Sequence, residues 1–233
     1  NLTSASDNAS TGIHVSGREK ETDNKYDGTV VIKNSTIVLD FLINKGAMTL
    51  DNATLTVKNG FAIGGRPASE TESGEDATAT MNLTNGSKLV VNNHNGMGLG
   101  YEAIGVMDVD ATSTFEATEN FLVTAKGTMN VAGTVKLAEG KTLTNNGAIV
   151  LTALEATLTA NECGNVTTNV ADHKAVYAGG AYKVVAKVYV AKVGDAQFET
   201  LNEAVEAVQD GGTVTVLEDI TFTTGANGST NGI

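Results

Sequence analysis

Residues 47–57 have the sequence AMTLDNATLTV, in which apolar and polar side chains alternate on both sides of a short polar corner. Met48 and Leu50 would point to one face of a first strand, and Leu55 and Val57 would point into the same interior from a second strand. Alternation of this kind is typical of β-strands that bury one face. The stretch therefore predicts two short strands joined at a sharp corner.

The same pattern recurs on both sides of this stretch. Copies begin at residues 29, 47, 80, 106 and 128, and a weaker copy begins at 148, which gives intervals of 18, 33, 26, 22 and 20 residues. A unit of about 20 residues with variable insertions is typical of a β-solenoid, in which each coil stacks on the one before. An antiparallel sandwich is the alternative, but it needs hairpin turns, whereas the corners KNST, DNAT and TNGS resemble one another. We therefore expect an all-β chain that forms a right-handed parallel β-helix, because parallel crossovers are almost always right-handed.

The apolar side chains of these copies are predicted to form the core. Aromatic residues make up only 5% of the chain and tryptophan is absent, which favours a thin core of stacked aliphatic side chains. The predicted inward positions are Val30, Ile32, Met48, Leu50, Met81, Leu83, Met107, Val109, Met129, Val131, Ile149 and Leu151, followed in the second strands by Ile37, Leu39, Leu55, Val57, Leu89, Val91, Phe115, Ala117, Val135 and Leu137.

Asn34, Asn52 and Asn85 occupy equivalent corner positions in three copies. Asparagine tolerates the left-handed backbone conformation that a sharp corner needs, and stacked side-chain amides can hydrogen-bond from coil to coil. We therefore predict a corner asparagine ladder at these positions. The alternative is glycosylation, because Asn34, Asn52, Asn82 and Asn85 each begin an N-x-[ST] sequon.

Two segments lack the alternating pattern and are predicted to leave the stack as loops. Residues 61–79 contain the only proline and an acidic cluster, and residues 92–105 are rich in glycine. Loops of this kind often carry binding residues, although a solvated insertion without a ligand is the simpler expectation.

The overall composition excludes several classes of protein. The formal net charge of −12 opposes nucleic-acid binding, which requires a basic surface. The single cysteine, Cys163, cannot form an internal disulfide. No run of about 18 apolar residues is present, so we expect no membrane span in this segment.

A different pattern begins after Cys163. Residues 181–194 alternate in the manner of a strand or hairpin outside the coil repeat, and a helix is predicted near 200–209. Thr200 and Glu203 have the spacing of a capping box, in which each side chain accepts a hydrogen bond from a free backbone N–H. The predicted helix carries one apolar stripe, formed by Leu201, Ala204, Val205 and Val208.

The sequence VGDAQFETLNEAVEAVQDGGTVTVLEDI, at 193–220, resembles the opening of pectin-lyase-like right-handed β-helix domains. It also resembles repeats of large surface proteins from gut-type Gram-positive bacteria. The resemblance implies a short strand, a helix that caps the end of a solenoid, and then the first coil. It implies nothing specific about an activity.

The two ends of the chain also resemble each other. TFTTGANGSTNGI at 221–233 aligns without a gap on NLTSASDNASTGI at 1–13, an offset of 220 residues. We therefore expect parallel coils at 1–180, then a linking strand, capping helix and first strand at 181–220. Residues 221–233 would begin a second repeat equivalent to 1–13.

No catalytic constellation is evident. The three histidines are widely spaced and form no metal or nucleophile motif, so we expect no enzymatic activity, no cofactor and no metal site. Asp108 and Asp110 are predicted on the solvent face of one strand, where a solvated surface is the simpler alternative to a ligand site. Tyr101 and Tyr26 are the two candidates for stacking against a sugar. Threonine positions are expected to scatter among the coils rather than to align on one face.

These observations favour a structural or adhesive module of an extracellular bacterial protein, at the cell surface or in a filament. Its expected partners are equivalent repeats or identical copies, stacked head to tail into a stiff stalk or fibre. Glycans or proteins of a host or the environment are further candidate partners. The alternative is a glycan-binding adhesin or an inactive polysaccharide-lyase-like domain.

Overall fold

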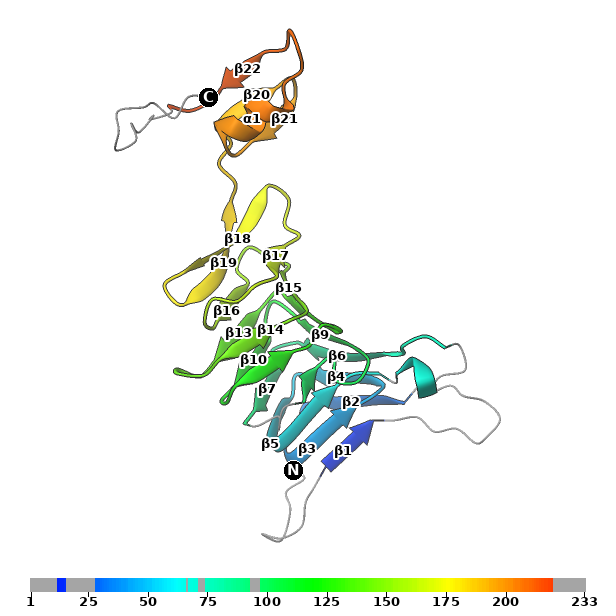
Figure 1. Ribbon diagram of the computed structural model, residues 1–233. Helices are drawn as coiled ribbons and strands as arrows, with labels where there is room; N and C mark the ends of the chain where they lie inside the picture. Colours follow the sequence, from blue (N-terminus) through cyan, green and yellow to red (C-terminus); the bar gives the residue numbers. More distant parts are fainter. Residues whose placement is uncertain (1–11, 16–27, 66, 71–73, 93–96, 220–233) are drawn as a thin grey trace. The chain divides into compact units, whose positions relative to one another are not determined.

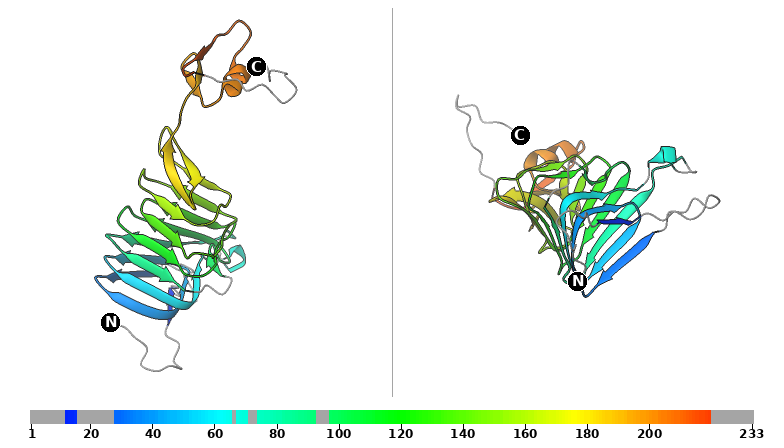
Figure 2. Two further views of the ribbon diagram at one scale, coloured as in Figure 1. Left: turned by 90° about the vertical axis from the view of Figure 1, so that its left-hand side faces the viewer. Right: turned by 90° about the horizontal axis from the view of Figure 1, so that it is seen from below.

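The computed structural model describes residues 12–15, 28–65, 67–70, 74–92 and 97–219. The chain divides into two compact units, Asn1–Val185 and Ala186–Ile233 (Figure 1). Parallel strands stack throughout most of the first unit, so the predicted β-solenoid is confirmed (Figure 2). The one α-helix of the described residues belongs to the second unit.

The first side of the solenoid is a seven-stranded parallel sheet, the first sheet. The initial residues of the predicted copies stand opposite one another in it, from Thr29 through Ala47, Thr80, Val106 and Thr128 to Ala148. The predicted coil spacing is therefore confirmed residue by residue. The strands are β2 (Thr29–Lys33), β4 (Ala47–Asp51), β6 (Thr78–Thr84), β9 (Ile104–Val109), β12 (Gly127–Val131), β15 (Ala148–Leu151) and β17 (Val166–Thr168).

The second side is a parallel ladder made by the predicted second strands of the copies. Thr36 pairs with Thr54, and the ladder continues through Lys88, Thr114 and Thr134 to Thr157. Its strands are β3 (Thr36–Asn44), β5 (Thr54–Ile63), β7 (Lys88–Val91), β10 (Thr114–Ala117), β13 (Thr134–Leu137) and β16 (Thr157–Thr159).

A third side completes each coil, and the sequence pattern did not predict it. The C-terminal halves of β3 and β5 turn onto this side and pair with short strands from other coils. These strands are β1 (Gly12–Val15), β8 (Gly98–Leu99), β11 (Phe121–Val123) and β14 (Leu143–Asn145). Strands of two to four residues are too short to show alternation.

The prediction that residues 61–79 and 92–105 leave the stack as loops was wrong in part. Phe61, Ala62 and Ile63 belong to β5 and are buried, although we expected residues 61–79 to leave the stack. Gly98 and Leu99 form β8 within the second predicted excursion. The remainder of the first insertion contains a short 3₁₀ helix, η1 (Ala68–Glu70).

The core lies between the three sides. Met48, Met81, Met107 and Met129 stand in register on successive strands, and none is exposed to solvent. Of the predicted inward positions, only Val30 and Leu137 are not fully buried. The core is less aliphatic than the low aromatic content suggests, because the rings of Phe61 and Phe121 pack there against the predicted inward residue Phe115, with centroids 5.0–6.4 Å apart.

A column of glycines lies at the corner where the chain enters the first sheet. A Cβ atom on Gly46, Gly105, Gly127 or Gly147 would lie 2.2–2.5 Å from a carbonyl oxygen of the backbone. Real Cβ atoms essentially never approach a backbone atom so closely, so these four positions require glycine. In the copy that starts at Thr80 the same place is taken by Ala79, which is completely buried.

The C-terminal end of the solenoid is closed by a hairpin. Strands β18 (His173–Ala178) and β19 (Ala181–Ala186) are neighbours joined through Gly179 and Gly180, both with positive φ, and β19 pairs antiparallel with β16. Positive φ at two central turn residues is the geometry of a tight hairpin turn. The predicted boundary at 180 falls in this turn.

The second unit is small. Its sheet has the order β21-β20-β22, with strands β20 (Ala191–Val193), β21 (Ala196–Phe198) and β22 (Val214–Val216), all antiparallel to their neighbours. The helix α1 (Leu201–Ala207) lies between β21 and β22 in the sequence and contacts all three strands.

Candidate functional site

The three predicted corner asparagines all adopt a left-handed backbone conformation, with φ between 49° and 56°. Asn52 Nδ2 donates a hydrogen bond to Asn34 Oδ1 at 2.8 Å, so these two amides form one step of a ladder. The next step differs from the prediction, because Asn85 Nδ2 donates to Asp51 Oδ1 at 2.7 Å instead of to Asn52. Each contact joins side chains of neighbouring coils.

Asp110 extends this corner column into the next coil. Its carboxylate accepts hydrogen bonds from the backbone N–H of Asn85, at 2.7 Å, and from both the N–H and the hydroxyl of Thr112, at 2.9 Å. Burial by itself would raise the pKa of Asp110, but hydrogen bonds from Ser113, Asn85 and Thr112 outweigh it and hold the pKa below its ordinary value. Asp110 is therefore an ionised partner of the stacked corners.

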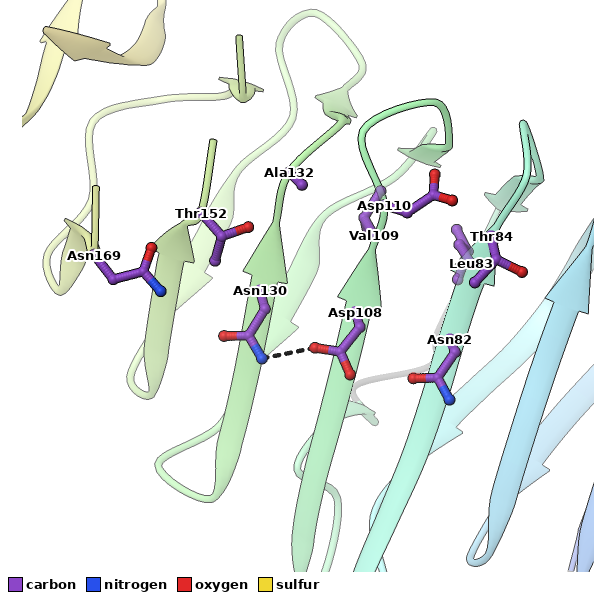
Figure 3. A pocket seen from close by; sticks show the side chains of 10 residues that line it. All are labelled: Asn82, Leu83, Thr84, Asp108, Val109, Asp110, Asn130, Ala132, Thr152 and Asn169. Atoms are coloured by element: carbon purple, nitrogen blue, oxygen red, sulfur yellow. Dashed lines mark hydrogen bonds between the residues drawn. The ribbon is translucent and has the colours of Figure 1, made fainter. Parts of the chain in front are cut away.

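The outer face of the first sheet carries a polar groove of about 490 Å³ (Figure 3). Asn82, Asp108 and Asn130 occupy one row, since they stand opposite one another on β6, β9 and β12. A second row begins two residues further along the strands and contains Thr84 and Asp110. The lining residues are Asn82, Leu83, Thr84, Asp108, Val109, Asp110, Asn130, Ala132, Thr152 and Asn169.

The groove is acidic and presents hydrogen-bonding groups to solvent. Asn130 Nδ2 donates to Asp108 Oδ1 at 2.7 Å, which orients both side chains in the row. In the part of the chain that the structure describes, no lysine, arginine or histidine lines the groove. Within the described ranges, no group of three histidine, cysteine, aspartate or glutamate side chains is arranged to hold a metal ion.

The structure brings together only two of the three predicted ligand-facing residues. Asp108 and Asp110 both line the groove, whereas Tyr101 lies in the turn between β8 and β9 and is half-buried. Its backbone N–H donates to Ile63 O at 3.1 Å. Tyr26 lies outside the described residues. The sequence pattern missed Asn82, Asn130, Thr152 and Asn169, whose alignment becomes visible only once the offsets between the copies are applied.

The nearby acidic residues serve other contacts. Glu116 and Glu119 pair with Lys88 and Lys141 on the second and third sides of the coils, both at 2.6 Å, and take no part in the groove. In the long insertion, Asp76 forms an ion pair with Lys126 at 2.6 Å. Hydrogen bonds from Lys126 and from the backbone of Ala68 lower the pKa of Asp76. This carboxylate anchors the insertion to the solenoid.

The threonines do not scatter as we expected. Five of them share one outward column on the second side of the solenoid, at the positions of Thr36, Thr54, Thr114, Thr134 and Thr157. Lys88 interrupts the column. The neighbouring outward column holds Glu116 and Lys136, so the face is not a uniform Thr-x-Thr array.

The helix α1 has the capping box that the sequence indicates. The side chain of Thr200 accepts from the N–H of Glu203 at 3.3 Å, and the Glu203 carboxylate accepts from the N–H of Thr200 at 3.1 Å. Of the apolar stripe, Ala204 is fully buried, while Leu201, Val205 and Val208 are half-buried. This helix packs on its own three strands.

Comparison with known proteins gives no relative for this chain: no family model, curated protein or solved structure matches it. No helix among the described residues combines the length and the apolar character required to cross a membrane.

Proposed function

We propose that this chain is a structural and adhesive module of an extracellular surface or filament protein, in which equivalent units follow one another along a stalk. The observation that carries the proposal is the organisation of the chain into a stacked solenoid with a closed end, followed by a separate small unit. A solenoid whose coils contact only their neighbours is a natural spacer, because added coils or units extend its length.

The closed end determines how units are joined. Strand β19 runs antiparallel to β16 and satisfies the edge of the second side within the same chain. An unpaired strand edge promotes uncontrolled association, and the hairpin covers the edge of β16 so that β18 becomes the outer strand of this sheet. We therefore infer that the parallel ladder does not continue directly into the next unit at this edge. Instead, the units are linked along the chain, and each forms its own solenoid.

The second unit supports the same organisation. Among its described residues only Ala191 and Ala204 are fully buried hydrophobic residues, while Val188, Val216 and Leu217 are at least 40% exposed. So small a core rarely stabilises an independent domain. We infer that this unit is the N-terminal cap of a following solenoid, as the pectin-lyase-like resemblance implies. The similarity of 221–233 to 1–13 agrees with this, although both segments lie almost wholly outside the described residues.

Immunogold electron microscopy of intact source cells tests the proposal. An antibody raised against the folded chain should label the outer surface or fibres that project from it. Label that appears only after the cells are permeabilised would refute an extracellular role. An antibody against a cytosolic protein of the same cells controls for leakage.

A further inference from the structure

We propose that the groove on the outer face of the first sheet binds an extended, neutral oligosaccharide. This site is independent of the proposed stalk, because a spacer needs no ligand on this face. The inference rests on the length of the groove, on its unused hydrogen-bonding groups and on its charge.

The groove is long in the direction of the stack. Its lining residues come from β6, β9 and β12 and from the residues that directly follow β9, β12, β15 and β17, which are Asp110, Ala132, Thr152 and Asn169. Neighbouring strands lie about 4.8 Å apart, so five successive segments span roughly 19 Å. That length suits a chain of several sugar rings lying across the strands.

The lining groups have hydrogen-bonding capacity that the fold does not use. The side chains of Asn82, Thr152 and Asn169 form no hydrogen bond to other described residues, and Asp108 accepts one from Asn130. Amide, hydroxyl and carboxylate groups together supply both donors and acceptors. Sugar hydroxyls are also both donors and acceptors, and neighbouring hydroxyls can bridge adjacent side chains of one row.

The charge of the groove selects among sugars. Among the described residues, Asp108 and Asp110 are the only ionisable side chains that line it, and hydrogen bonds hold the pKa of Asp110 below its ordinary value. A uronate, sulfate or phosphate group would meet these two carboxylates and none of the described cations. Like-charge juxtaposition is unfavourable, so acidic polysaccharides are excluded in favour of neutral ones.

A glycan-binding assay with defined probes tests the proposal. The folded chain would be screened against immobilised neutral hexasaccharides of glucose, mannose, galactose, xylose and N-acetylglucosamine, with hexagalacturonate as the acidic probe. Isothermal titration of the best probe follows. Asn82→Ala should weaken its binding by about fivefold, the effect of one net hydrogen bond. Asn82→Ala combined with Asn169→Ala should weaken binding further.

The matched control is Thr134→Ala, which removes an outward polar side chain from the second side of the same solenoid. It should leave affinity unchanged. Binding to no neutral probe at millimolar concentration would overturn the proposal, and so would a preference for hexagalacturonate. Equal affinity of the wild type and the double variant, with both folded by circular dichroism, would place the ligand elsewhere and equally overturn it.

Discussion

Asn52 donates its side-chain amide to the side-chain oxygen of Asn34 at 2.8 Å, although the two residues are 18 positions apart in the sequence. Both occupy the left-handed region of backbone conformation, at φ of 50° and 49°. The contact shows how one residue type serves two purposes at a solenoid corner. Asparagine tolerates the turn, and its amide joins one coil to the next.

Substitution of Asn52 separates these two contributions. Asn52→Ala loses the amide contact and also the short polar side chain that makes the left-handed conformation tolerable, so it should lower the free energy of unfolding by about 2 kcal/mol. Asn52→Gly loses the contact but relieves the backbone, so it should be the less destabilising change. Urea unfolding followed by circular dichroism measures both. If glycine were as harmful as alanine, the backbone strain assigned to this corner would be disproved.

Two positions of the glycine column should differ sharply in the cost of substitution by alanine. Gly127→Ala would place a Cβ 2.5 Å from Leu99 O, and the resulting backbone shift should cost about 1–3 kcal/mol. Gly164 precedes β17 at the equivalent place in the last coil, where nothing lies within 4 Å of an added Cβ. Gly164→Ala should therefore be nearly neutral. Thermal unfolding of the two variants, side by side, checks the contrast, and equal effects would rule out the proposed close contact.

Tyr182 fastens the closing hairpin to the last coil. Its hydroxyl accepts a hydrogen bond from the N–H of Cys163 at 2.7 Å and donates one to the Cys163 carbonyl. The centroid of its ring lies 5.0 Å from the ring centroid of Tyr177. Tyr182→Phe should cost about 1–2 kcal/mol, because two backbone groups lose their partner. Tyr177→Phe is the matched control and should cost less.

Cys163 provides a local readout of the same contact. Burial raises the pKa of its thiol, so alkylation by iodoacetamide at neutral pH should be slow in the wild type. Tyr182→Phe should loosen the surrounding turn, admit water and accelerate alkylation. An unchanged rate in Tyr182→Phe, together with unchanged stability, would show that the hydroxyl does not hold this end closed.

The lowered pKa of Asp110 predicts that the stability of the fold depends on pH. Because its pKa is lower in the folded state than in the unfolded chain, the carboxylate stabilises the fold above the unfolded pKa. That contribution is lost as the pH falls through the folded pKa. Asp110→Asn should lower stability by about 1 kcal/mol at pH 7, and the difference from wild type should shrink below about pH 4.

The control for this titration is Glu155→Gln, which removes an exposed carboxylate from the same solenoid. It should change neither the stability at pH 7 nor its slope with pH by a comparable amount. Urea midpoints measured from pH 7 to pH 2.5 compare the three proteins. A difference between Asp110→Asn and wild type that persists undiminished at pH 2.5 would contradict the assigned role of the carboxylate.

The sequence predicted the stacking of the coils because burial dictates alternation. Met48, Met81 and Met107 could be aligned from their spacing alone, since each must point into the core. Long strands with one buried face leave a signal that insertions between copies do not remove. The register of the first sheet follows directly from it.

The third side of the coils left no such signal. Leu99 and Val123 pair across strands of two and three residues, which are too short for a period to appear. A glycine precedes most of the copies in the sequence. The reason for it, a close approach to the backbone of a neighbouring coil, becomes apparent only in the stacked structure. The sequence predicted only part of the groove. Asp108 and Asp110 lie two residues apart in the sequence, whereas Asn82 and Asn169 come to lie on the same face only because of the register between the strands.

The measurement that tests the account most directly is top-down mass spectrometry of the protein isolated from its source, first under native and then under denaturing conditions. The account predicts particles that contain two or more equivalent units, with fragments resembling 186–220 directly before sequence equivalent to 1–65. A lone chain of 23.9 kDa under both conditions, with no second unit bound or linked, would contradict it.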